Sequence, residues 1–191
     1  MSDLAALRAS RQIRLLGNDA VQDDLKLDER QRIEVQRLSE RVNQQFQEMI
    51  DQLGRRPPSE RLRRLLEDAR QNESIARTIL SQEQLRRLYQ ISLQTDVSDA
   101  FRDPEVATAL RLTSEEQERA RVIEEEILGN LLRSAQGQNQ PQRPTEDQPR
   151  PSANRRALAI LSEQQLLKWR EITGIPFATE IPRPPLPLPK K

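Results

Sequence analysis

Apolar residues recur every three or four positions through most of the chain, and polar or charged residues separate them. Such spacing places apolar side chains along one side of an α-helix. The two longest stretches predict long amphipathic helices at residues 28–53 and 113–133. In the first, the apolar residues are Ile33, Val35, Leu38, Val42, Phe46, Met49 and Leu53. Shorter helical stretches follow both, so the pattern predicts an all-α fold with no β-sheet.

Residues that are able to cap a helix mark where several shorter helices begin. Asn18 and Asp103 each precede a short apolar helix, and Pro104 occupies the first helical position after Asp103. After the long helix, Pro57-Pro58 interrupts the pattern, and Ser59 is expected to cap the helix that follows.

The second half of the chain repeats the apolar pattern of the first. A shift of 85 residues takes seven apolar residues onto apolar residues, starting with Val21 onto Val106. Further along, a shift of 81 residues takes 79–81 onto 160–162, so the intervening segment is shorter in the second half. The match predicts two tandem copies of one helical-hairpin unit, each with a long amphipathic helix, a return and a final helix.

The pattern also predicts how the chain divides. Residues 1–17 form an N-terminal arm, 18–97 the first helical repeat and 98–177 the second. Within the second repeat, 134–154 is almost free of apolar residues and is expected to be a flexible, disordered loop. The Pro-rich tail, 178–191, is expected to be a disordered polyproline II segment.

Four segments share one helix-start motif, a leucine followed by a capping residue and then, three positions on, by Gln or Glu. In such a capping box the side chain of each partner accepts a hydrogen bond from the backbone N–H of the other. We interpret these residues as structural helix caps and not as catalytic groups. The pairs are Asp28 with Gln31, Ser81 with Gln84, Thr113 with Glu116, and Ser162 with Gln165.

As a set, these segments resemble the LTxxQ-motif family, the Spy/CpxP-like proteins of the bacterial envelope, and especially its two-copy relatives. The resemblance covers residues 18–177. It is carried best by Leu80-Ser81-Gln84, Leu161-Ser162-Gln165 and Leu166-Leu167-Lys168-Trp169. It implies a hairpin-rich all-α fold, no enzymatic activity and a periplasmic location. The best-known members are ATP-independent chaperones or stress-sensing inhibitors that cradle other polypeptides.

The composition excludes several kinds of chemistry. The chain has no Cys and no His, so a disulfide and a Ser-His-Asp or Cys-His pair are impossible. The usual ligands of zinc, haem and iron–sulfur clusters are also missing, and we expect no metal and no cofactor. An enzyme would have to work with carboxylates alone, yet runs such as Glu124–Glu126 diverge around a helix. We therefore expect no enzymatic activity.

Charge and hydropathy bear on partners and location. The chain has 31 basic and 30 acidic residues, a net charge of +1. Because the two signs are interspersed, no basic field is left to attract nucleic acid. No apolar run approaches the ~20 residues that span a bilayer, and the displayed start lacks the apolar stretch of a secretory signal. We expect a cytoplasmic location if that start is the natural one, and a periplasmic location if the chain follows the LTxxQ-motif family that it resembles.

Two groups of residues are candidates for binding polypeptides, either unfolded clients or a specific partner. Leu128 and Leu132 widen the apolar side of the second long helix, so they must meet the other copy, a client or a second chain in a homodimer. The alternative function is a structural or scaffolding protein that uses its helical surface or its Pro-rich tail. The second group is basic and consists of Arg55, Arg56, Arg61, Arg63 and Arg64. We expect it either to capture acidic clients or to form an ordinary charged turn.

Overall fold

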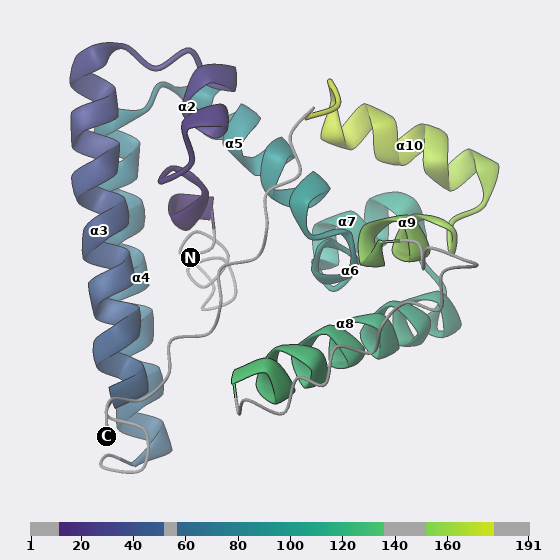
Figure 1. Ribbon diagram of the computed structural model, residues 1–191. Helices are drawn as coiled ribbons and strands as arrows, with labels where there is room; N and C mark the ends of the chain where they lie inside the picture. Colours follow the sequence, from purple (N-terminus) through teal and green to yellow (C-terminus); the bar gives the residue numbers. More distant parts are fainter. Residues whose placement is uncertain (1–11, 52–56, 136–151, 178–191) are drawn as a thin grey trace. The chain divides into compact units, whose positions relative to one another are not determined.

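The computed structural model of the protein describes residues 12–51, 57–135 and 152–177. In these residues the chain forms helices joined by turns and contains no strand, which confirms the all-α prediction (Figure 1). Residues 12–15 are also helical. The helices are α2 (Asp19–Asp24), α3 (Glu29–Asp51), α4 (Pro58–Ile79), α5 (Gln82–Thr95), α6 (Val97–Ala100), α7 (Pro104–Leu110), α8 (Ser114–Ala135), α9 (Ala153–Leu158) and α10 (Glu163–Thr173).

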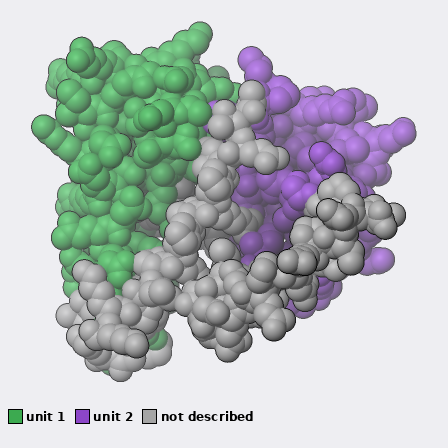
Figure 2. All heavy atoms as spheres, in the orientation of Figure 1, with its two compact units in different colours: residues 1–92, 187–191 green, residues 93–186 purple. Residues whose placement is uncertain are grey.

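The chain divides into two compact units, with the boundary between Ser92 and Leu93 (Figure 2). Unit 1 contains α2, α3, α4 and most of α5. Unit 2 contains the last turn of α5 and the helices from α6 to α10. Each unit has its own set of buried apolar side chains.

In unit 1, the long helices α3 and α4 run side by side in opposite directions (Figure 1). Residues 12–17, which precede α2, pack into this unit, since Ile13 and Leu16 are fully buried. A Cβ atom on Gly17 would lie 2.5 Å from the hydroxyl oxygen of Ser39 on α3, so a glycine allows this close approach. Nearby, the guanidinium of Arg14 lies 5.1 Å from the centre of the Phe46 ring.

The start of α4 differs from the prediction that Ser59 caps it. The helix begins at Pro58 with Pro57 in the capping position, and no side chain caps its first turn. Proline has a fixed φ close to the helical value and no N–H that needs a partner. The two prolines can therefore start the helix without the serine.

The predicted loop at 134–154 is wrong at both ends. The helix α8 continues to Ala135, and α9 begins at Ala153, where the side chain of Ser152 accepts a hydrogen bond from the backbone of Arg155. The side chain of Asn154 joins this start to other parts of unit 2, as described below. Residues 136–151, like the Pro-rich tail at 178–191, lie outside the described residues.

The core of unit 2 contains the single tryptophan of the chain. The rings of Phe101 and Trp169 meet edge to face, with their centres 5.5 Å apart. Both side chains are buried, Phe101 completely. The end of α10 is held by Gln94 of α5, whose side-chain amide donates to the carbonyls of Thr173 at 2.8 Å and Ile175 at 3.0 Å.

The turn that leads into the long helix has the same geometry in both units. Lys26 before α3 and Arg111 before α8 both adopt a left-handed conformation with φ of 52°. The next residues, Leu27 and Leu112, each donate a backbone hydrogen bond to the carbonyl five residues earlier, at 3.1 and 2.9 Å. Non-glycine residues rarely adopt positive φ, so the two units share an unusual local conformation.

Candidate functional site

The helix-start motifs of unit 1 lie against each other. Asp28 and Gln31 exchange the two hydrogen bonds of a capping box, and so do Ser81 and Gln84. The side-chain amides of Gln31 and Gln84 are also bonded to each other, with 3.0 Å between the donor nitrogen of Gln31 and the oxygen of Gln84. Gln31 reaches further to the carbonyl of Ile79, at 2.9 Å. These glutamines therefore join the starts of α3 and α5.

Unit 2 contains a similar junction between the starts of α8 and α10. The carboxylate of Glu116 accepts from the backbone and hydroxyl of Thr113, at 2.7 and 3.0 Å, and from the side-chain amide of Gln165 at 3.2 Å. Ser162 and Gln165 complete a capping box of their own. The backbone hydrogen bond from Thr113 is the main reason why the pKa of Glu116 is lowered, with smaller contributions from Gln165 and Arg119. The arrangement orients backbone and amide groups at the starts of the two helices.

Replacing Glu116 with glutamine is expected to make unit 2 less sensitive to acid. A lowered pKa in the folded state means that the ionised carboxylate stabilises the fold above its unfolded-state pKa of about 4.5. That stabilisation is lost as the pH falls through the folded-state pKa. Urea unfolding, followed by the fluorescence of Trp169 between about pH 6 and pH 3, measures the loss. The wild type should lose more stability over this range than Glu116→Gln.

The matched control for this prediction is Glu115→Gln. Glu115 is the exposed neighbour of Glu116, and its side chain makes no hydrogen bond among the described residues. Its replacement should leave the wild-type pH dependence unchanged. Equal pH dependence in wild type and Glu116→Gln would show that the junction carboxylate contributes nothing.

The basic candidate segment is only partly within the described residues. Arg55 and Arg56 lie outside them, whereas Arg61, Arg63 and Arg64 lie on the first turns of α4. Arg61 is half-buried, and the other two are exposed. The structure therefore describes three of the five arginines in the predicted basic segment.

An exposed leucine, Leu62, stands next to arginines in the sequence of the first turns of α4. The side chain of Leu62 is 52% exposed. Arg63 lies 3.9 Å from Glu67, and its side chain is 74% exposed, so this ion pair leaves most of the guanidinium in water. Arg64 lies 3.5 Å from Glu48 and 4.0 Å from Asp68. We call Leu62, Arg63 and Arg64 the α4 patch.

The apolar candidates, Leu128 and Leu132, both lie on α8. Their side chains are outside the described residues. Their contact with the other copy, a client or a second chain therefore stays a prediction from the sequence.

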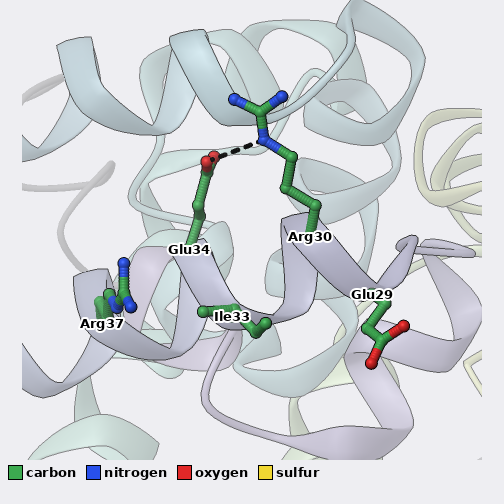
Figure 3. A pocket seen from close by; sticks show the side chains of 5 residues that line it. All are labelled: Glu29, Arg30, Ile33, Glu34 and Arg37. Carbon is green, nitrogen blue, oxygen red and sulfur yellow. Dashed lines mark hydrogen bonds and ion pairs between the residues drawn. The ribbon is translucent and has the colours of Figure 1, made fainter.

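A surface hollow that the sequence analysis did not single out lies on the outer side of α3. It has a volume of about 360 Å³ and is open to solvent; Figure 3 shows its lining residues Glu29, Arg30, Ile33, Glu34 and Arg37. Glu34 accepts from Arg30 at 3.2 Å. The side chain of Ile33, on this helix, is 50% exposed.

A sequence signal for this exposure exists in the spacing of the apolar residues. From Val35 through Leu38 to Val42, the steps are three and four residues, and all three side chains are buried. Ile33 precedes Val35 by only two residues, which is a rotation of about 200° around a helix. It therefore points away from the buried row.

Three further observations concern metal ligands, membrane-spanning helices and known proteins. The residues that the structure describes contain no cluster of three or more acidic side chains able to hold a metal ion. Within the same residues, no helix has the length and apolarity to cross a bilayer. No family model, no curated protein and no solved structure matches the chain.

Proposed function

We propose that this protein is not an enzyme and that it binds other polypeptides on the outer surfaces of its helices. The α4 patch is the proposed first contact. Its exposed leucine, 52% accessible and followed in the chain by two exposed arginines, is the observation that carries the proposal. An apolar side chain with charged neighbours suits a protein contact, in which the apolar group anchors and the charges steer the approach.

The charges of the α4 patch favour acidic segments of a client. The first turns of α4 hold three arginines, and the guanidinium of Arg63 is largely free to meet an added carboxylate. Burial raises the pKa of the Asp68 carboxyl, while Arg64 and Arg41 lower it. An incoming acidic side chain would compete with Asp68 for Arg64. Capture of this kind is weak and tolerant of sequence, which suits unfolded polypeptides.

The hollow on α3 does not favour catalysis, although two carboxylates line it. Glu29 and Glu34 lie on successive turns of one helix, beside two arginines and open to water (Figure 3). Acid–base catalysis by two carboxylates uses unlike environments that face one enclosed substrate. The open hollow provides neither, and so it supports a contact surface better than an active site.

We further propose that the two units are copies of one helical-hairpin unit and that the chain is a relative of the LTxxQ-motif proteins. Two observations support the repeat. The left-handed turns at Lys26 and Arg111 are 85 residues apart, as are Gln31 and Glu116, which occupy corresponding places in the two helix-start junctions. On this proposal, a chaperone-like or stress-related role in the envelope is the expected setting.

The test is suppression of the aggregation of a chemically denatured model protein, without nucleotide, at low and high salt. The wild type should suppress aggregation, and more weakly at about 0.5 M salt, because screening shortens the reach of the arginines. Leu62→Ser/Arg63→Gln should suppress several-fold less. The matched control is Leu167→Ser/Arg170→Gln, which removes an equally exposed leucine and an exposed arginine from α10. The control should behave like the wild type.

Two outcomes would contradict the proposal. Absence of suppression by the wild type at several-fold excess, in either salt, would favour a scaffolding protein with one dedicated partner. Equal losses in the α4 and α10 variants would mean that binding does not depend on the α4 patch. Circular dichroism of each variant verifies that the helices are intact.

A further inference from the structure

The outer side of α3 carries a row of three residues with an ordered change of charge. Glu29, Ile33 and Arg37 follow one another at intervals of four residues, so they form a single ridge along the helix. All three side chains are exposed, and Ile33 is half accessible. The ridge therefore presents an acid, an apolar group and a base in line, as Figure 3 shows.

The two outer charges of this ridge have no ion-pair partner within the part of the chain that the structure describes. Their neighbours do: Arg30 lies 3.2 Å from Glu34, and Arg32 lies 2.7 Å from Asp23. Glu29 and Arg37 are thus opposite charges, one turn before and one turn after Ile33, that the described residues leave without an ion-pair partner.

Such a ridge is complementary to a second copy of itself that runs in the opposite direction. A two-fold axis at Ile33 brings the two isoleucines together and places each Glu29 beside the Arg37 of the other copy. Rows of four-residue spacing are inclined by about 26° to the helix axis, so two such rows run along each other when the helices cross at about 50°. Two-fold contacts are the commonest in homo-oligomers, and they require a self-complementary surface of this kind.

We propose that the ridge Glu29–Ile33–Arg37 on α3 is the surface through which two copies of this chain associate. The occupant is a second copy because one ridge supplies both charges that the other lacks. Each copy contributes one large apolar side chain, much less than the roughly 800 Å² per partner of a stable complex. The dimer is therefore weak and forms at high protein concentration. This association lies on α3 and is separate from the polypeptide binding proposed for α4.

The absence of cysteine from the chain permits a direct test by disulfide cross-linking. Ile33→Cys places one thiol of each copy at the two-fold axis, where the Cα atoms come within the range of a disulfide. Under mild oxidation, we expect Ile33→Cys to form covalent dimers several-fold faster than Leu62→Cys. Leu62 is the matched control because its side chain is equally exposed, on α4. Equal rates would show only random collision and would overturn the proposal.

Charge reversal in the Ile33→Cys background tests the orientation. Glu29→Arg alone places arginine against arginine twice, and Arg37→Glu alone places glutamate against glutamate twice. Each should slow cross-linking by about tenfold, since two attractive contacts become repulsive. An equal mixture of the two variants restores opposite charges at both contacts, but only in mixed dimers. We therefore expect the mixture to cross-link at the original rate and to yield mainly mixed dimers by mass spectrometry.

The remaining outcomes are equally decisive. Cross-linking that is unaffected by the single reversals would mean that the copies meet through another surface or in another orientation. Slow cross-linking of the mixture, with intact helices by circular dichroism, would exclude the head-to-tail pairing of Glu29 with Arg37. Both results would overturn the proposal.

Discussion

Replacing Phe101 with alanine is expected to destabilise unit 2 by about 3–5 kcal/mol, because it removes a large, fully buried side chain and leaves a cavity. Phe101 is 0% exposed, and its ring packs edge to face against Trp169 at 5.5 Å. The surrounding helices can close such a cavity only in part, since protein interiors are close-packed. The loss of the aromatic contact adds to the loss of buried apolar surface.

Trp169 provides the measurement. It is the only tryptophan of the chain, and it lies in unit 2. Urea unfolding followed by its fluorescence therefore reports on the unit in which Phe101 is replaced. The control is Phe46→Ala in unit 1, where the side chain is only half-buried. Because Trp169 reports on unit 2, its unfolding transition should shift much less in this control. A loss below about 1 kcal/mol for Phe101→Ala, the size of an ordinary surface effect, would contradict this account of the core.

Replacing Asn154 with alanine is expected to destabilise unit 2 by about 2–3 kcal/mol, because three backbone groups lose their partner. The side-chain amide of Asn154 donates to the carbonyls of Gln94 at 3.2 Å and Thr95 at 3.1 Å. Its oxygen accepts from the backbone N–H of Val97, at 3.2 Å. One side chain thus holds together the end of α5, the start of α6 and the start of α9.

Hydrogen exchange measures this effect at the site itself. In Asn154→Ala, the amide of Val97 should exchange faster, and the loss of stability should appear in the Trp169 fluorescence. Asn154→Asp is informative because a carboxylate can still accept from Val97 but cannot donate to the two carbonyls. The control is Asn43→Ala on α3, where the side chain is exposed and the change should stay within about 0.5 kcal/mol. Unchanged exchange at Val97 would contradict the proposed role of Asn154.

The sequence alone was sufficient for the features that depend on near neighbours in the chain. The course of α3 follows from the steps of three and four residues between its buried residues. The starts of α2 and α7 follow from Asn18 and from Asp103 before a proline. At Ser162 and Gln165, both partners of the capping box are three residues apart, so their hydrogen bonds form wherever the helix starts. Each of these interactions joins residues within one or two helical turns of each other, so no distant residue is needed to specify it.

Only the tertiary structure decided which surfaces meet. Gln31 and Gln84 are 53 positions apart, and no local pattern indicates that their amides bond to each other. Asn154 stands in a segment so polar that it resembled a disordered loop, yet its side chain joins three backbone groups from about 60 residues away. Ile33 is apolar and still exposed, because the packing of α3 uses the row through Val35. A residue's type limits the contacts that it can make, but the choice among distant partners depends on how the helices pack.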